Sequence, residues 1–187
     1  NLQIGQETTP EQYVQRLSEL FAELYRVVKP SGSAWVVIGD KYLNGELLGM
    51  PWRVCFGIKD AGWILRSDCI WQKPNAMPSP AKTRPTTDHE YIFFFSRSKS
   101  YFYDADAIRE PHSEVSLARA QRNRFGGKYN GSDPKEHGQL KAGRNYGPDG
   151  DPDKVCSPGG RNVRTVWNIS TKPYSDAHFA TFPPDLP

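Results

Sequence analysis

The feature that most constrains the fold is the stretch 63–95, in which two apolar segments flank a polar loop. The segments 63–71 and 90–95 are rich in Ile, Phe, Trp and Tyr, which is typical of strands. The loop between them is interrupted by prolines and carries Lys73, Asn75, Arg84, Asp88 and His89. This pattern predicts a rigid scaffold that presents polar groups at one edge of a sheet.

A strong helix signal lies near the start of the chain, in residues 9–29. Thr9 is placed to cap a helix, Pro10 suits its first turn, and Gln12 completes a capping box. Apolar residues then recur on one helical face until a Pro-Ser-Gly sequence ends the pattern. We therefore expect an amphipathic helix whose apolar face packs against a sheet.

The elements that follow alternate between strand and helix. Residues 33–39 (SAWVVIG) form a continuous apolar run, which predicts a strand buried on both faces. Residues 51–61 predict a second helix, interrupted by Gly57, before the strand at 63–71. The strand at 90–96 follows without a helix, so we expect it to run antiparallel to its predecessor. The alternation predicts an α/β fold with a mostly parallel sheet that includes one antiparallel strand.

Residues 109–163 differ from the rest of the chain in composition. Between residues 109 and 164 there are eleven Lys and Arg against seven Asp and Glu, and apolar residues are sparse. A segment of this length without a core is a functional loop region or disordered, apart from a short helix expected at 114–124. Residues 164–169 (RTVWNI) then predict a return to strand.

Composition limits the classes of protein to which the chain can belong. Its 187 residues suffice for one domain with a substantial core, and its net charge of +3 permits a polyanionic partner without requiring one. Three widely spaced cysteines form no Cys/His cluster, so the sequence predicts no metal site and reduced thiols in a cytoplasmic setting. No apolar run approaches the roughly 20 residues of a membrane-spanning helix, so no membrane partner is expected.

A specific order of residues runs through the central stretch. It consists of DCIWQKPNAMP from residue 68, then Arg84, then His-Glu at 89–90. This order resembles the central block of the β-class DNA amino-methyltransferases, which use S-adenosylmethionine to methylate the exocyclic amine of adenine (N6) or cytosine (N4). Ala76 stands where that family usually has Pro.

The resemblance extends along most of the chain. GQE at 5–7 and the helix at 9–29 look like the segment that follows the family's catalytic loop, and residues 35–40 resemble its next strand with a terminal acid. Residues 164–168 and HFATFP at 178–183 are similar to the segment that leads to the methionine end of the cofactor.

The resemblance implies a fold, a domain organisation and partners. The fold is a Rossmann-like methyltransferase sheet with a loop-rich insertion. Residues 1–108 would form the core, 109–163 the target-recognition insertion, and 164–187 the cofactor-side return to the core. The implied partners are S-adenosylmethionine and double-stranded DNA. Because family members are often dimers, a homodimer is a candidate assembly.

The resemblance also implies roles for particular residues. Four residues would support the reaction around the base: Asp40, Lys73, Asn75 and His89. Six would bind the cofactor: His178, Phe179, Ala180, Thr181, Phe182 and Pro183. Five would contact DNA: Arg84, Arg119, Arg122, Asn123 and Arg124. Without the resemblance, Asp40 is equally well explained as a helix cap or turn residue, Lys73 and Arg84 as solvated loop charges, and His89 as a hydrogen bonder at a strand start.

Two family features are absent from these 187 residues. The catalytic Pro-Pro-aromatic loop is expected before Asn1, and the Phe-x-Gly-x-Gly cofactor loop is expected after residue 187. We therefore interpret the chain as an internal fragment with little or no activity alone. The alternative is a non-catalytic DNA-binding module on the same scaffold. An RNA or protein amino-methyltransferase is disfavoured because the central block resembles the DNA enzymes.

Overall fold

The computed structural model describes residues 3–118, 159–172 and 182–186. The chain divides into two compact units, one formed by residues 1–103 with 164–187 and the other by residues 104–163. None of the helices in the described ranges combines the length and the apolar character that a membrane span requires.

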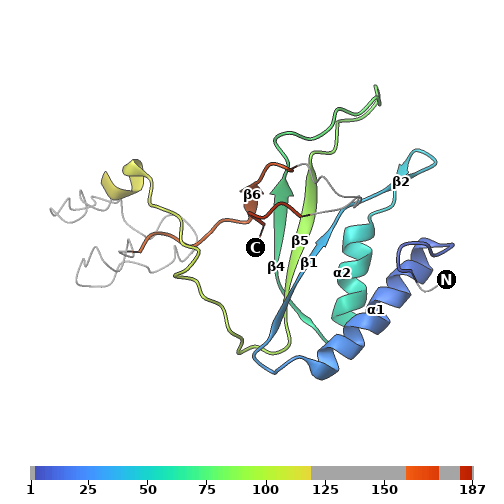
Figure 1. Ribbon diagram of the computed structural model, residues 1–187, viewed down its shortest axis with the longest axis horizontal. Coiled ribbons are helices and arrows are strands. Elements are labelled where there is room, and N and C mark those ends of the chain that lie inside the picture. Colours follow the sequence, from blue (N-terminus) through green and yellow to red (C-terminus); the bar gives the residue numbers. More distant parts are fainter. Residues whose placement is uncertain (1–2, 119–158, 173–181, 187) are drawn as a thin grey trace, which may run out of the picture. The chain divides into compact units, whose positions relative to one another are not determined.

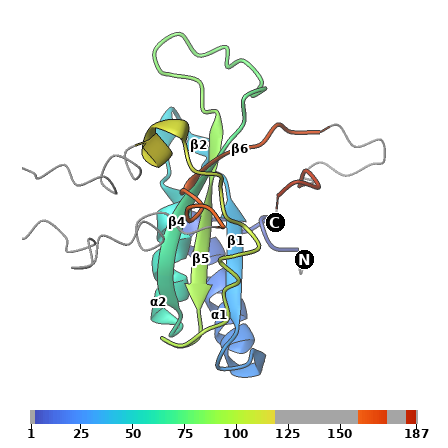
Figure 2. The same ribbon diagram turned by 90° about the vertical axis from the view of Figure 1, so that its left-hand side faces the viewer.

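The first unit is a four-stranded sheet with two helices on one face (Figures 1 and 2). The strand order in the sheet is β1-β5-β4-β6, and β2 and β3 form a separate hairpin. In chain order the elements are α1 (Pro10–Val27), β1 (Ser33–Ile38), β2 (Tyr42–Leu43), β3 (Glu46–Leu47), α2 (Met50–Asp60), β4 (Ile64–Gln72), β5 (His89–Ser96) and β6 (Val166–Asn168).

Strand β5 is the only strand of this described sheet that runs in the reverse direction. It pairs antiparallel with both β1 and β4, whereas β6 pairs parallel with β4. The predicted α/β class and the antiparallel direction of β5 are confirmed. The sheet was predicted to be mostly parallel, and three of its four described strands do run in the same direction. These strands are not all neighbours, however, because β5 lies between β1 and β4. Most of the hydrogen-bonded pairs in the described sheet are consequently antiparallel.

The core lies on both faces of β5. Phe93 and Phe95 are fully buried on the face that packs against the helices, and Ile92 is buried on the other face with Cys69 and Trp71. Trp63 and Trp71 are also buried, each at 3% exposed. The expectation that residues 33–39 are buried on both faces is wrong for the described part of the chain. β1 lies at the sheet edge, and its Trp35 remains 39% exposed.

The ends of α1 and α2 follow from local chemistry. Thr9 caps α1, and its Oγ1 accepts a hydrogen bond from the Gln12 N–H at 3.3 Å. The reciprocal bond of the capping box is displaced by one residue, since Gln12 Oε1 accepts from Thr8 N rather than from Thr9 N. Helix α2 ends at Asp60 with Ala61 as its C-cap, and Gly62 follows with a φ of 102°, which a residue with a side chain would adopt only with strain.

Gly57 does not interrupt α2 but allows it to approach α1. The helix runs unbroken through this position, and a Cβ atom placed there would lie 2.3 Å from Ser18 Oγ of α1. Ser18 Oγ in turn donates to the Val14 carbonyl at 2.8 Å. The glycine is therefore required by close helix packing rather than by a break in the helix.

The hairpin of β2 and β3 was not predicted, although residues 41–50 contain a signal for it. Asn44 and Gly45 join the two strands and have φ angles of 52° and 87°. Asn-Gly at such positions is the preferred sequence of a two-residue hairpin turn. The strands are only two residues long, so no run of alternating apolar residues accompanies the turn.

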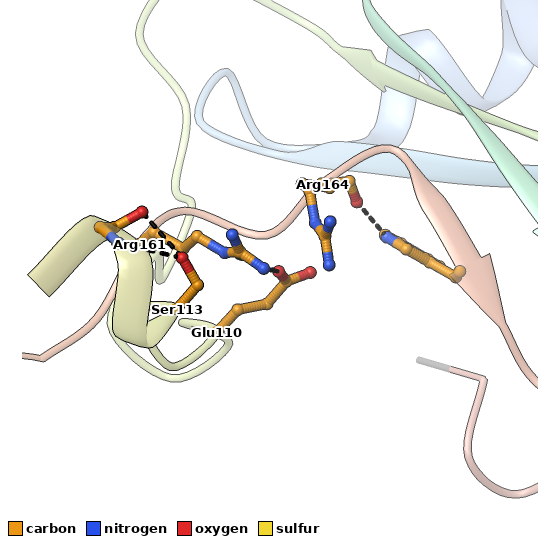
Figure 3. A network of polar contacts seen from close by, with 6 residues as sticks. Glu110, Ser113, Arg161 and Arg164 are labelled. Carbon is orange, nitrogen blue, oxygen red and sulfur yellow. Dashed lines mark hydrogen bonds and ion pairs between the residues drawn. The ribbon is translucent and has the colours of Figure 1, made fainter. Parts of the chain in front are cut away.

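In the second unit, a bridge between Glu110 and Arg161 connects two distant segments (Figure 3). Each residue's N–H donates to the other's carbonyl, at 2.9 and 2.8 Å. The Arg161 guanidinium also binds Glu110 Oε2 through Nε at 3.0 Å and Nη2 at 2.9 Å. Of the helix expected at 114–124, residues 114–118 are helical and the rest lie outside the described residues.

The first prediction concerns the contact between α1 and α2. In an unhindered helix, Gly→Ala stabilises by roughly 1 kcal/mol. Here the added methyl group must displace Ser18 Oγ from its hydrogen bond, so we expect Gly57→Ala to destabilise the protein by about 1 kcal/mol in urea unfolding. In a Ser18→Ala background the same change should be neutral or stabilising. Equal effects of Gly57→Ala in both backgrounds would contradict this packing.

The second prediction concerns the two buried thiols. Burial raises the pKa of Cys55 to about 11 and also raises the pKa of Cys69. Since only the thiolate is nucleophilic, both thiols should resist iodoacetamide at pH 8 in the folded protein and react fully after unfolding in urea. Peptide mass spectrometry resolves each site. Rapid alkylation of Cys55 in the folded protein at pH 8 would contradict the burial.

Candidate functional site

One edge of the sheet gathers the polar residues that flank the central loop. Strands β1, β4 and β6 end at this edge, and the reversed strand β5 begins there. The loop 73–88 projects beyond this edge (Figures 1 and 2). The register pairs Trp71 with Glu90 and Gln72 with His89. The arrangement follows from the direction of β5, which brings its first residues beside the last residues of β4.

Lys73 and Glu90 form an ion pair at the centre of this edge. Lys73 Nζ binds Glu90 Oε1 and lies 4.4 Å from the centre of the Trp71 ring. The side chains of Lys73 and Glu90 are only 21% and 28% exposed. A Cβ atom placed on Gly39 would lie 3.4 Å from the Glu90 side chain, so the pair is close to the end of β1. Lys73 is thus not a solvated loop charge but a fixed one.

Asp88 and His89 form a second polar group beside the first. Gln72 Nε2 donates to Asp88 Oδ2, and His89 Nδ1 lies 3.3 Å from Asp88 Oδ1. The hydrogen bonds from Gln72 and then from His89 hold the pKa of Asp88 below its usual range. The His89 ring packs edge-on against Tyr91, with ring centres 5.7 Å apart. His89 therefore acts at least as the strand-start hydrogen bonder that its position predicts.

The loop 73–88 is tied to the sheet at several points. Lys73 N donates to Asp88 O at 2.7 Å, which closes the base of the loop. The Asn75 side chain makes two 3.0 Å hydrogen bonds with the backbone of Thr171, which follows β6. The Arg84 guanidinium carbon lies 3.6 Å from the centre of the Tyr42 ring in the hairpin. These contacts give the loop a defined shape although it lacks regular structure.

Asp40 has the bonding pattern of a helix cap. Its Oδ1 accepts hydrogen bonds from Lys41 N at 2.8 Å and from Met50 N, at the start of α2, at 3.0 Å. The N-cap residue Gly49 has no side chain for this purpose, so Asp40 supplies the acceptor from the end of β1. This matches the capping alternative, and a role of Asp40 in the reaction stays a prediction.

A cavity of about 370 Å³ lies beside the end of β1. Its walls come from the segment before α1, the first turns of α1, the end of β1, the β2–β3 hairpin and the start of α2. The lining residues are Gly5, Glu7, Thr8, Thr9, Pro10, Tyr13, Ile38, Gly39, Lys41, Leu43, Leu48 and Met50. The lining is mainly apolar on the hairpin and strand side and carries polar groups on the α1 side.

The remaining predicted residues are only partly within the described chain. Arg119, Arg122, Asn123, Arg124, His178, Phe179, Ala180 and Thr181 lie outside the described residues. Phe182 is 62% exposed, whereas Pro183 is buried and its carbonyl accepts from Leu186 N at 3.0 Å. Leu186 packs on the cluster of Cys69, Trp71 and Ile92.

Sequence reasoning left two contributors out of the site. Glu90 is a charged residue near the start of an apolar strand, but its pairing with Lys73 depends on the β4–β5 register, which the sequence does not display. Tyr42, whose ring contacts the Arg84 guanidinium, is in the hairpin strand that leads into the Asn-Gly turn. That turn signal was sufficient to find the hairpin, although not its contact with the loop.

The family of the chain is shown by comparison with known proteins. The family model described as DNA methylase matches residues 1–187, which is the whole chain. The chain belongs to the DNA methylase family. The family resemblance read from the central block is thereby confirmed.

Two curated relatives are similar to this chain over nearly its whole length. It is 36% identical over 213 residues to the type II methyltransferase M.XycI of Xanthomonas campestris pv. cyanopsidis, covering 98% of this chain and 57% of that protein. It is 34% identical over 210 residues to the type II methyltransferase M.SmaI of Serratia marcescens, covering 97% and 58%. The chain thus spans less than two thirds of the length of these relatives.

A solved structure supports the same fold. PvuII DNA methyltransferase (cytosine-N4-specific) matches with a TM-score of 0.51 at 20% identity, over 72% of this chain and 56% of that one. At this identity the likeness concerns the fold alone. It agrees with the predicted Rossmann-like methyltransferase sheet.

The third prediction tests whether Lys73 and Glu90 stabilise the edge as a pair. Lys73→Met leaves the half-buried Glu90 carboxylate without its partner, so we expect a loss of about 1–3 kcal/mol in urea unfolding at pH 7. Lys73→Met combined with Glu90→Gln should recover part of that loss, because no unpaired charge remains. Lys82→Met, on an exposed residue of the same loop, is the control and should change stability by less than about 0.5 kcal/mol. Strictly additive effects of the two site changes would contradict the pairing.

Proposed function

We propose that this chain forms the core of an S-adenosylmethionine-dependent DNA methyltransferase that modifies an exocyclic amine, either cytosine N4 or adenine N6. The observation that carries the proposal is the family match along the whole chain, together with the polar edge where β1, β4 and β6 end. In open α/β sheets, ligands bind beyond the carboxyl ends of the strands. The names of the curated relatives, type II methyltransferases, support the same activity.

The reaction depends on alignment. An exocyclic amine is a weak nucleophile because its lone pair is delocalised into the ring. Most of the catalysis must therefore come from holding the amine and the methyl group in line. The base has to leave the duplex to reach such a site. Lys73, held by Glu90 and the Trp71 ring, supplies a preorganised positive charge at the rim.

The described cofactor-side segment fits S-adenosylmethionine. Phe182 exposes its ring while the adjacent Pro183 is buried, and Leu186 anchors the segment to the sheet. An exposed aromatic ring can stack on an adenine or face a sulfonium cation. When bound, the cofactor supplies the methyl group on its positively charged sulfur. His178, Phe179, Ala180 and Thr181 remain part of this proposal as further contacts.

Arg84 is the described residue best placed to bind the DNA backbone. Its guanidinium stacks on Tyr42, and within the described part of the chain no ion pair of Arg84 with a carboxylate is found. A guanidinium stacked on a ring can still donate from its edge to a phosphate. Such a contact positions the DNA but does not read its sequence. We assign base readout to Arg119, Arg122, Asn123 and Arg124 in the insertion.

The fourth prediction is methyl transfer by the polypeptide of the complete gene. Purified protein, S-adenosylmethionine and unmethylated duplex DNA are incubated, the DNA is digested to nucleosides, and the products are analysed by mass spectrometry. We expect one new nucleoside, N4-methylcytosine or N6-methyladenine, which also names the target base. The 187-residue chain alone is expected to give little or no product.

The outcome separates the enzyme from the binding module. Absence of both methylated nucleosides with the complete gene product would overturn the proposed activity. If that protein still binds duplex DNA in a salt-dependent manner, it is a non-catalytic DNA-binding module on this scaffold.

A further inference from the structure

The loop 73–88 carries the most exposed large apolar side chain of the described residues. Met77 is 87% exposed, whereas the only other methionine of the chain, Met50, is 7% exposed. Single exposed apolar residues are common on protein surfaces. Met77 differs from them in its position, because its loop projects beyond the edge where β1, β4 and β6 end (Figures 1 and 2).

The chain is held on both sides of Met77. Before it, the Asn75 side chain is hydrogen-bonded to the backbone that follows β6, and after it Arg84 stacks on the β2–β3 hairpin. Prolines, whose φ angles are fixed, further restrict the segment: Pro74, Pro78, Pro80 and Pro85. A side chain on a segment that is already ordered loses less conformational entropy when it binds a partner.

The charges of the loop suit a polyanion. Residues 74–87 include Lys82 and Arg84 but no Asp or Glu, and Lys82 is exposed. The two carboxylates that follow the loop, Asp88 and Glu90, are bonded to neighbouring side chains. Positive charges beside an exposed apolar tip complement a ligand whose phosphates surround an apolar interior.

Duplex DNA is such a ligand, and base flipping creates a place for the side chain. When a base leaves the stack, its neighbours lose their contact with it. Proteins that deform DNA frequently insert apolar side chains, methionine among them, between base steps. Methionine suits this role because it is unbranched and its thioether makes favourable contacts with aromatic rings.

We propose that Met77 enters the base stack of the bound duplex and fills the gap left by the flipped base, while Lys82 and Arg84 bind the flanking phosphates. The inference rests on the proposed function and deepens it, since it assigns residues to the step that precedes methyl transfer. Met77 contacts the DNA but not the reacting atoms, so it is a positioning residue. It favours the flipped state and leaves the alignment of amine and methyl group unchanged.

The fifth prediction uses oxidation of Met77 as a footprint. The complete gene product is treated with hydrogen peroxide alone, with duplex DNA or with polyphosphate, and sulfoxides are located by peptide mass spectrometry. Duplex DNA should protect Met77 at least about fivefold, whereas polyphosphate, which has charges but no base stack, should protect it little. The buried Met50 should stay unoxidised in every sample and is the internal control.

Substitution of Met77 separates insertion from folding. Once the methylated site is located by sequencing, two duplexes are compared, one with the target base paired and one with it opposite an abasic position. Met77→Ala should slow methylation of the paired duplex about tenfold but that of the abasic duplex less than about twofold, since its target is already unpaired. Met77→Leu should restore most of the rate. Val27→Ala, at a 61% exposed residue that ends α1, is the control and should change neither rate.

Each outcome decides the inference. Equal oxidation of Met77 with and without DNA, or equal protection by DNA and polyphosphate, would overturn it even if the gene product methylates DNA. Protection of Met77 in the complete gene product before DNA is added would assign the loop tip to the rest of the polypeptide and overturn it too. So would equal slowing of both duplexes by Met77→Ala. Protection by duplex DNA alone, without methyl transfer, would support insertion while the proposed activity fails.

Discussion

The first unit depends on the burial and direction of β5. Its apolar side chains fill the core on both faces of the sheet, with Ile92, Phe93 and Phe95 at most 2% exposed. It pairs with both β1 and β4 and so joins these two strands in the sheet. Because β5 runs against them, its first residues, His89 and Glu90, meet the carboxyl ends of its neighbours. The hydrophobic burial of one strand thus determines which polar groups share the edge.

Charge pairing then gives that edge a defined geometry. Lys73 is held by Glu90 and by the Trp71 ring, and Asn75 is held by the backbone of Thr171. A half-buried ion pair contributes little net stability, because desolvation offsets most of the attraction. The pair instead restricts where the Lys73 ammonium can lie. For a reaction that depends on alignment, a fixed charge is more useful than a mobile one.

Two carboxylates near the end of β1 differ in how their oxygens are bonded. Asp40 has donors for its Oδ1 from two backbone N–H groups and stabilises the start of α2. The Glu7 side chain is 8% exposed, pairs with Arg16 at 3.8 Å, and accepts a hydrogen bond from Gly5 N through Oε2. The first pattern is what helix capping requires, whereas the second fixes the segment before α1 against that helix.

The sequence by itself determined the features that depend on neighbouring residues and on residue order. Local periodicity and turn chemistry predicted the Thr9 cap, the stop of α2 before Gly62 and the antiparallel β5. The order of residues from Asp68 to Glu90 indicated the family. Only the tertiary structure decided which groups meet. The Lys73–Glu90 pair requires the β4–β5 register. The need for a glycine at position 57 arises only because α1 packs closely against α2. The burial of Glu7 requires elements from several parts of the chain. Contacts between residues far apart in sequence depend on packing, which local patterns do not encode.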